Sequence, residues 1–230
     1  MNLMRQLKNS LTPDETRYYK PILGLFRGIS LPLNLHNQFA IFVGIHERPL
    51  YSYIKKYITP GAVCYDIGAS CGEFTMAFAK LAQNGSVYAF EPQNNYVEMF
   101  PETIKRNSDI KSAIHVYNYF VDSNHIPEEQ HVSVDGLVEK MGLMPPDVIK
   151  IDIDGGEYDL LLGASHTIAK YRPKMIVEVH SFALEEKCQS FLREHGYSIS
   201  VVNPETILGW KERRVSELNR WNCAEIMGDE

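Results

Sequence analysis

The sequence has no paired cysteines, no long apolar run and no tract of low complexity. Its four cysteines are scattered over 230 residues without a CxxC pair, which argues against a zinc knuckle and against a disulfide framework. The first residues lack the apolar core of a signal peptide, and no apolar run is long enough to cross a bilayer. We therefore expect a soluble, cytoplasmic protein with reduced thiols and no membrane span.

Positive charge is also scarce. The chain has 23 Lys and Arg residues against 29 Asp and Glu residues, a formal net charge of −6, so it lacks the broad basic field on which nucleic acids bind. The best local basic cluster, Lys211, Arg213 and Arg214, is typical of a solvated surface. A nucleic-acid partner is not expected, and the sequence leaves the oligomeric state open.

Residues 1–45 differ in pattern from the rest of the chain. Pro21, Gly24, Gly28 and Pro32 interrupt this stretch and no period is sustained through it, which predicts irregular structure or short helices packed on a main body. We interpret residues 1–45 as an N-terminal extension or cap over the functional site. Residues 46–230 are interpreted as one domain that carries the site.

From residue 49 onward, strand-like and helix-like segments alternate. The predicted strands are residues 62–68, 86–92, 113–121, 147–153, 174–180 and 197–202. The predicted helices are residues 49–58, 71–83, 96–107, 157–171 and 185–195, the third of them kinked or broken at Pro101. Such a βαβ series predicts an α/β fold with a mainly parallel sheet and helices on both of its faces.

The segment CYDIGASCGEFT, residues 64–75, joins the first of these strands to its helix. Gly68 and Gly72 let the backbone turn sharply and let a ligand approach closely, at the sheet edge where doubly wound folds bind ligands. The spacing is GxxxG rather than the GxGxxG of dinucleotide-binding folds, and Asp66 precedes it. A carboxylate there repels a pyrophosphate and attracts an ammonium, so the sequence favours a cationic ligand over a phosphorylated one.

Acidic residues end three successive strands of this pattern. Asp66 ends the first strand, Glu91 ends the second and Asp122 follows the third. A carboxylate at the position of Glu91, roughly 20 residues after the glycine loop, is suited to the two hydroxyls of an adenosine ribose. Asp122 is spaced to meet the adenine amino group. Together these three acids predict S-adenosylmethionine as the cofactor.

Four blocks of the sequence resemble the FkbM-type methyltransferases. They are GIHERPL leading into ITPGAVCYDIGASCGEFT, then VYAFEP, DVIKIDIDGGEYDLLLGA and PKMIVEVH, in the family's order between about residues 44 and 182. The resemblance implies a Rossmann-like class I methyltransferase fold with a mainly parallel seven-stranded sheet and a reversed last strand. It also implies O-methylation of a hydroxyl on a small natural product, sugar or glycan, which would be the partner of the protein.

The chain departs from the family pattern at a few places. Ser70 stands where the family typically has Asn and Asp154 where it typically has Glu, and both replacements keep hydrogen-bonding character. The segment between Asp122 and Asp147 is short, which bears on the class of substrate. The residues that we expect to contact S-adenosylmethionine are Asp66, Gly68, Ala69, Ser70, Gly72, Phe74, Glu91, Asp122 and Asp152.

Methyl transfer to an alcohol requires that the hydroxyl be aligned with the methyl group and lose its proton. Asp152 lies at the end of the predicted strand 147–153, Asp154 follows that strand directly, and His180 ends strand 174–180. We therefore predict these three residues as catalytic. His180 is favoured as the general base because an imidazole titrates near neutral pH. Each has a purely structural alternative: His180 caps the helix that follows it, and Asp154 is the N-cap of the helix beginning near Glu157.

No residue is assigned as a metal ligand. The acids at 152, 154 and 157 together with His180 would suit Mg²⁺ or a transition metal, but carboxylates cluster at strand ends without metals too, so a divalent metal is not favoured. Two other functions remain open. One is a scaffold that binds S-adenosylmethionine without catalysis, and the less favoured one is a nicotinamide-dependent oxidoreductase, against which the missing GxGxxG stands.

Overall fold

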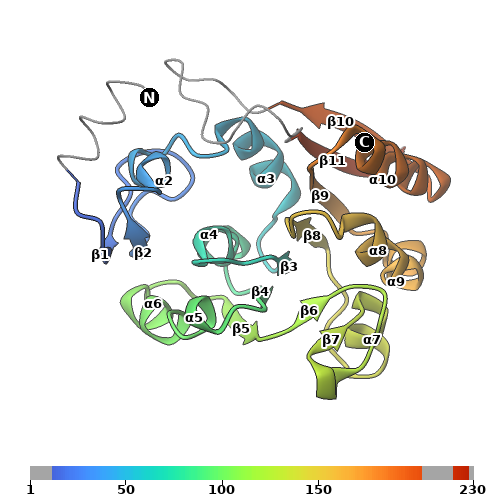
Figure 1. The fold of residues 1–230 in the computed structure, drawn as a ribbon, viewed down its shortest axis with the longest axis horizontal. Coiled ribbons are helices and arrows are strands. Elements are labelled where there is room, and N and C mark those ends of the chain that lie inside the picture. The colour runs from blue at the N-terminus through green and yellow to red at the C-terminus, as the bar shows by residue number, and fades with distance from the viewer. Residues whose placement is uncertain (1–11, 204–219, 228–230) are drawn as a thin grey trace.

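A seven-stranded mixed sheet runs through the computed structural model, which describes residues 12–203 and 220–227 (Figure 1). In spatial order its strands are β10 (Tyr197–Val202), β11 (Arg220–Ile226), β9 (Lys174–Val179), β8 (Val148–Ile151), β3 (Val63–Ile67), β4 (Ser86–Phe90) and β5 (Ala113–Tyr117). Only β11 is antiparallel to its neighbours β10 and β9, and the other adjacent pairs are parallel. The expected Rossmann-like fold with a reversed last strand is confirmed. The basic cluster of Lys211, Arg213 and Arg214 lies outside the described residues.

Side-chain alternation along β3 divides the core into two layers. Cys64 packs into the layer on one face of the sheet, whereas Tyr65 and Ile67 pack into the layer on the other face. The first layer includes α3 (Tyr51–Tyr57) and α4 (Glu73–Ala82). The second includes α7 (Val134–Glu139), α8 (Glu157–Leu162), α9 (Ser165–Tyr171) and α10 (Phe182–Glu194), on the opposite side of the sheet (Figure 1).

The N-terminal segment contains an antiparallel strand pair that the sequence pattern did not reveal. β1 (Thr16–Tyr19) pairs with β2 (Leu31–Asn34), and the short helices α2 (Phe39–Val43) and η1 (Arg48–Leu50) follow. The prediction of irregular structure or short helices was therefore wrong for these two strands. Proline is depleted in strands, so Pro32 within β2 argued against a strand at this position. An edge strand nevertheless tolerates a proline.

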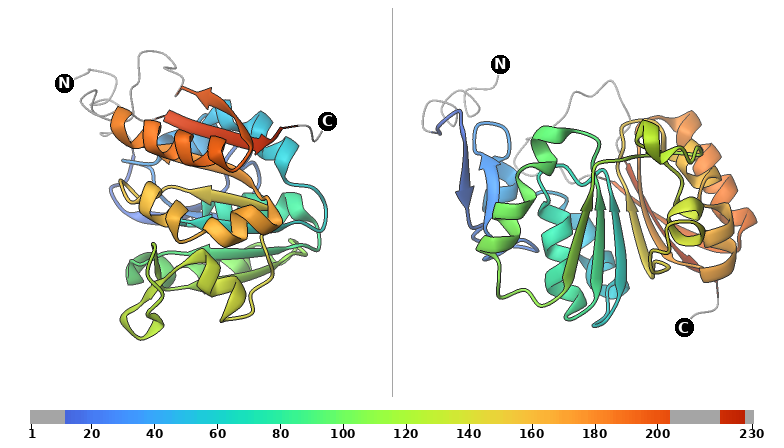
Figure 2. Two further views of the ribbon diagram at one scale, coloured as in Figure 1. Left: turned by 90° about the vertical axis from the view of Figure 1, so that its right-hand side faces the viewer. Right: turned by 90° about the horizontal axis from the view of Figure 1, so that it is seen from below.

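This segment packs tightly on the sheet domain. Phe26, Leu31 and Leu33 are fully buried in the same layer as α4. The backbone N–H of Ser30 donates to Oδ1 of Asn107 at 2.8 Å, and Nδ2 of Asn107 donates to the Ser30 carbonyl at 2.9 Å. Figure 2 shows the two strands beside the α5 and α6 end of the molecule, away from α10. The described part of residues 1–45 thus shares the core of the domain that follows.

The predicted third strand, residues 113–121, divides in the structure. β5 ends at Tyr117, and β6 (Phe120–Val121) pairs with β7 (His131–Val132) in a separate two-stranded sheet, with η2 (Pro127–Glu129) between them. Nδ2 of Asn118 donates to the carbonyl oxygens of Glu91 and Pro92, at 3.0 and 2.9 Å. These bonds redirect the chain out of the main sheet, so the prediction of one continuous strand was wrong and Asp122 follows β6.

The predicted helix 157–171 is also two helices, α8 and α9, separated at Gly163 and Ala164. A Cβ at Gly163 would lie 2.3 Å from the carbonyl oxygen of Asp122, so this close approach to the loop after β6 requires glycine. The predicted break near Pro101 is confirmed, because α5 (Asn94–Val97) ends before α6 (Phe100–Arg106) begins with Pro101 in its first turn.

The helices and the cysteines bear on the expectations of no membrane span and of reduced thiols. Within the described ranges, no helix combines the length and the apolar character that a bilayer span needs. All four cysteines, Cys64, Cys71, Cys188 and Cys223, are buried free thiols. Burial raises the pKa of Cys188 and of Cys223 to about 12.

Candidate functional site

A cavity of about 690 Å³ opens at the carboxyl end of the central strands. Residues that follow β3, β4 and β8 line it, as does Glu178 near the end of β9. Its volume lies in the range of small-molecule sites. The cavity therefore occupies the edge at which doubly wound sheets bind their ligands.

The predicted cofactor residues divide into two groups. Those that line the cavity are Gly68, Ser70, Glu91, Asp122 and Asp152. Those that are buried next to it without lining it are Asp66, Ala69, Gly72 and Phe74. The residues of the first group thus surround one cavity, and the residues of the second group pack behind the cavity wall.

The glycine loop fits closely against the end of β8. Gly68 has φ +78°, and a Cβ there would lie 1.8 Å from the carbonyl oxygen of Asp152. Ser70 also has a positive φ, 47°, and Gly72, with φ 84°, is the N-cap of α4. These conformations favour glycine or a small polar residue, which explains the local sequence GASCG.

Glu91 holds this loop in place. The carboxylate accepts the backbone N–H of Ser70 at 2.8 Å on one oxygen and the backbone N–H of Gln93 at 2.8 Å on the other. The residue is only 4% exposed, yet it lines the cavity. A carboxylate has about four acceptor positions, so each oxygen keeps capacity for a ligand hydroxyl.

Asp66 faces away from the cavity, under α4. Because Tyr65 and Ile67 face the other layer, alternation turns Asp66 toward the hydroxyl of Thr75, which donates to it at 2.5 Å. Nζ of Lys150 lies 3.2 Å from Oδ1 of Asp66. The cation beside Asp66 in this structure is therefore the buried lysine.

Lys150 connects this buried acid to the cavity. Its Nζ lies 3.6 Å from Oδ2 of Asp152 and donates to the carbonyl oxygen of Gly68 at 3.2 Å. Burial lowers the pKa of the ammonium, but the carboxylates of Asp66, Asp152 and Glu73 outweigh burial, so the pKa of Lys150 is raised. Lys150 stays charged and orients Asp152 from the protein side.

Asp122 lies at a different part of the cavity, with Tyr119 and Phe120 among its neighbours in the wall. Its Oδ2 is 2.5 Å from Nδ1 of His131, and its Oδ1 accepts the backbone N–H of Asn124 at 2.6 Å. The side chain is 21% exposed. Asp122 is thus an oriented acceptor beside two aromatic rings.

His180 lies among several carboxylates at the ends of β8 and β9. Its Nδ1 is 3.1 Å from Oε1 of Glu157, and its Nε2 is 3.1 Å from Oδ1 of Asp154 and 3.9 Å from Oε2 of Glu178. The hydrogen bond to Glu157 is the largest effect on the imidazole and raises the pKa of His180, against the lowering effect of burial. A raised pKa lowers the fraction of the ring that is neutral and able to accept a proton at a given pH, relative to an unperturbed histidine.

The structural alternatives for His180 and Asp154 do not hold. The N-cap of α10 is Ser181, whose hydroxyl accepts the N–H of Leu184. The N-cap of α8 is Gly156 rather than Asp154. Both residues instead contribute side chains to the carboxylate and imidazole group.

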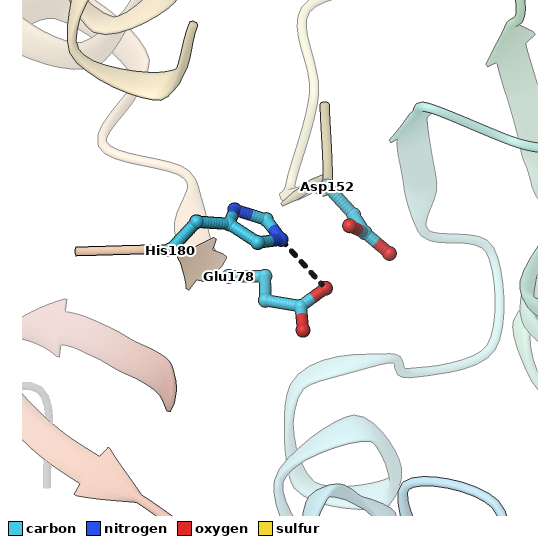
Figure 3. A group of neighbouring side chains, drawn as sticks. All are labelled: Asp152, Glu178 and His180. Atoms are coloured by element: carbon cyan, nitrogen blue, oxygen red, sulfur yellow. Dashed lines mark ion pairs between the residues drawn. The ribbon is translucent and has the colours of Figure 1, made fainter. Parts of the chain in front are cut away.

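Asp152, Glu178 and His180 come closest together. Each has a ligand-type atom within 4.8 Å of one such atom in both of the others. Figure 3 shows their polar ends gathered in one place, with Nε2 of His180 directed at Glu178. Asp152 and His180 were predicted as functional from the sequence, whereas Glu178 was not placed in the site.

The model of the methyltransferase FkbM domain matches residues 98–199 of this chain. This part of the chain resembles the methyltransferase FkbM domain. The resemblance seen in the sequence is confirmed where the two overlap, over residues 98–182, and the matched region contains Asp122, Asp152 and His180.

Solved structures with the same fold include several methyltransferases. The methyltransferase FkbM from Methylobacillus flagellatus is 18% identical with a TM-score of 0.52, over 83% of this chain and 52% of that chain. A SAM-dependent O-methyltransferase from Thermotoga maritima is 11% identical with a TM-score of 0.52, over 76% and 63% of the two chains. TYW2 from M. jannaschii, in complex with AdoMet, is 13% identical with a TM-score of 0.56, over 93% and 86%. At these identities the likeness establishes the fold alone.

A curated relative extends the comparison to a much larger protein. The AMB antimetabolite synthetase AmbE from Pseudomonas aeruginosa is 22% identical over 259 aligned residues. The match covers 84% of this chain but only 12% of AmbE. This chain therefore corresponds to a small part of that relative.

Several residues that line the cavity were not predicted from the sequence. Gln38, Ile41, His46 and Glu47 line the cavity from the N-terminal side of the chain, and Trp221 lines it from β11. Nε1 of Trp221 donates to Oε2 of Glu47 at 2.7 Å. No local pattern marks these residues, because they reach the cavity only through contacts between distant segments.

Proposed function

We propose that this protein transfers the methyl group of S-adenosylmethionine to a hydroxyl of a small natural product, sugar or glycan. The observation that carries the proposal is a single cavity lined both by the glycine loop with Glu91 and by Asp152, Asp154 and Glu178. The first set suits the cofactor, and the second suits a polar acceptor group. The FkbM family match supports methyl transfer.

The cofactor would lie along the carboxyl edge of β3 and β4. Its methionine part would meet Gly68 and Ser70, its ribose hydroxyls would donate to Glu91, and its adenine would lie near Asp122. Glu91 is already oriented by two backbone N–H groups, so little order is lost when a ribose binds. The solved TYW2 structure, which contains AdoMet on the same fold, supports this choice of cofactor.

The N-terminal segment would form part of the acceptor pocket. Gln38, Ile41 and His46 line the same cavity as Asp152, although they lie far from it in sequence. Residues 1–45 would then act as a wall over the acceptor, and residues 46–230 as the cofactor-binding catalytic domain. Ile41 offers an apolar surface, while Gln38 and His46 offer hydrogen bonds, a combination that suits a sugar or a polar natural product.

The reaction would be an in-line displacement. The acceptor oxygen forms a bond to the methyl carbon, the bond from sulfur to methyl breaks, and sulfur keeps the electron pair as S-adenosylhomocysteine forms. Asp152 and His180 would orient the hydroxyl and handle its proton. Asp154, with a side chain 80% exposed, would connect this group to solvent.

Turnover on a set of hydroxyl compounds tests the proposal. Incubation with methyl-labelled S-adenosylmethionine should yield S-adenosylhomocysteine and an O-methylated product, identified by mass spectrometry. His180→Ala should lower kcat on the order of 100-fold with cofactor affinity nearly unchanged. The matched control is His166→Ala on α9, where the side chain is 76% exposed.

The rival functions give different results in the same experiment. A non-catalytic scaffold would bind S-adenosylhomocysteine without turnover on any acceptor. A nicotinamide oxidoreductase would change NADH absorbance with an alcohol substrate and would not bind S-adenosylhomocysteine. Methylation of nitrogen or carbon in place of oxygen would refute the hydroxyl acceptor while leaving the methyltransferase.

A further inference from the structure

The ends of β8 and β9 place two carboxylates and one imidazole around a common point. β8 and β9 are parallel neighbours with Ile151 opposite Val177, so Asp152 emerges beside Glu178. Side chains alternate along an extended chain, so Glu178 and His180 share a side. The register of two buried strands therefore assembles Asp152, Glu178 and His180, whose ligand-type atoms lie within 4.8 Å of one another (Figure 3).

The orientation of the imidazole is set from outside this group. Nδ1 of His180 lies 3.1 Å from Oε1 of Glu157, which also accepts the backbone N–H of Gly155 at 3.0 Å. Glu157 is fully buried, so its carboxylate is a fixed partner for the Nδ1 proton. A carboxylate that binds one ring nitrogen and turns the other toward an ion is the usual arrangement around metal-binding histidines.

The three side chains differ from a solvated acidic cluster in their burial. Glu178 is 3% exposed, His180 is 13% exposed and Asp152 is 24% exposed, and both Glu178 and Asp152 line the cavity. The core therefore holds Glu178 and His180 in place, and Asp152 and Glu178 border the space for a small molecule. Ligand atoms that share a divalent ion at about 2.1 Å lie roughly 3 to 4.2 Å apart, so a small closure of the observed group would satisfy coordination.

We propose that Asp152, Glu178 and His180 bind a divalent cation such as Mn²⁺, which holds the acceptor hydroxyl for methyl transfer. The inference rests on the proposed function, because it concerns the acceptor side of the same cavity. Two carboxylate oxygens and one imidazole nitrogen suit a divalent first-row or hard cation, and this ligand number leaves positions for the acceptor. The sequence had not favoured a metal; the assembled geometry is what changes that expectation.

The role of the ion would be to make the hydroxyl a better nucleophile. A hydroxyl bound to a divalent cation loses its proton at a lower pH than a free hydroxyl. The proton would pass to Asp154 and on to water, while the oxygen takes the methyl group and sulfur keeps the electron pair. His180 would then act as a ligand, and Glu157 as its positioning residue.

Binding of Mn²⁺ to the full-length protein tests the site without reference to activity. Electron paramagnetic resonance or calorimetry with MnCl₂ alone should detect one bound ion per chain. Glu178→Gln should weaken Mn²⁺ binding at least tenfold, and Glu157→Gln on the order of 10- to 100-fold, as loss of a histidine's carboxylate partner does at other metal sites. The matched control, Glu186→Gln at an exposed position of α10, should bind Mn²⁺ like the natural protein.

The outcomes separate this inference from the proposed function. Stoichiometric Mn²⁺ binding that Glu178→Gln loses and Glu186→Gln keeps supports the site, provided that Glu178→Gln still binds S-adenosylhomocysteine and is therefore folded. If Glu178→Gln does not fold, Glu157→Gln and Asp152→Asn take its place. No bound Mn²⁺, or equal affinity in all variants, overturns the metal site. Undiminished O-methylation in EDTA also overturns the metal site and leaves the proposed function standing. A natural protein that binds Mn²⁺ but no S-adenosylhomocysteine contradicts the proposed function and leaves the metal site standing.

Discussion

Replacement of Glu91 by alanine should weaken the binding of S-adenosylhomocysteine at least tenfold. In the structure the Glu91 carboxylate lines the cavity and accepts the backbone N–H groups of Ser70 and Gln93, each at 2.8 Å. With a ribose bound, the same two oxygens would accept its two hydroxyls. Alanine removes all four interactions and leaves a water-sized gap beside the glycine loop.

The magnitude follows from the charge on the acceptor. A hydrogen bond to a charged group contributes about 1.5 to 3 kcal/mol, and water replaces part of what is lost. A net loss of about 1.4 to 3 kcal/mol corresponds to roughly a 10- to 150-fold increase in Kd. Loss of the amide contacts adds to this effect, because Ser70 has a positive φ, 47°, that the carboxylate helps to hold.

Calorimetric titration with S-adenosylhomocysteine measures the effect directly. The matched control is Glu98→Ala, which removes the same charge from an exposed position at the end of α5 and should leave Kd within about twofold. Thermal unfolding without ligand verifies that both variants are folded. If folded Glu91→Ala binds as tightly as the natural protein, the carboxylate does not contact the ribose and the proposed cofactor orientation is wrong.

Two further predictions concern the folded framework. Gly68→Ala should destabilise the protein by at least about 2 kcal/mol in urea unfolding, because its Cβ would lie 1.8 Å from the Asp152 carbonyl oxygen; Gly142→Ala, with φ +71° and no atom within 4 Å of the new Cβ, should cost only about 1 kcal/mol. Equal losses would show that the loop does not pack as closely as described. All four thiols should react with Ellman's reagent only after unfolding, because each is buried and burial raises the pKa of Cys188 and Cys223 to about 12; rapid reaction of any thiol in the folded protein would contradict that burial.

Local sequence patterns predicted the main sheet and the part of the cavity wall formed by the glycine loop and Glu91. Strand–glycine–helix order located the loop at Gly68 and Gly72, and an acid at the next strand end located Glu91. Both features depend on residues close together in the chain, where backbone conformation and alternation follow from residue type. The seventh strand and its reversal came from the family resemblance rather than from the residues of β11.

Other parts of the fold depended on contacts that a local pattern does not contain. Strand 113–121 divides because Asn118 bonds to Glu91 and Pro92, and helix 157–171 divides where Gly163 approaches the loop at Asp122. β1 and β2 pair across a gap in sequence, with Pro32 inside the second strand. In each case a distant partner decides where an element ends.

The sequence by itself determined the fold class, the glycine loop and the set of acidic strand ends, because each of these features depends on residues that are close together in the chain. Only the tertiary structure decided what each acid faces. Alternation and the packing of α4 turn Asp66 onto Lys150, whereas the register of β8 and β9 brings Asp152 beside Glu178 and His180. Side-chain direction and strand register are properties of the packed sheet, and the chemistry of an acidic residue follows from them as much as from its type.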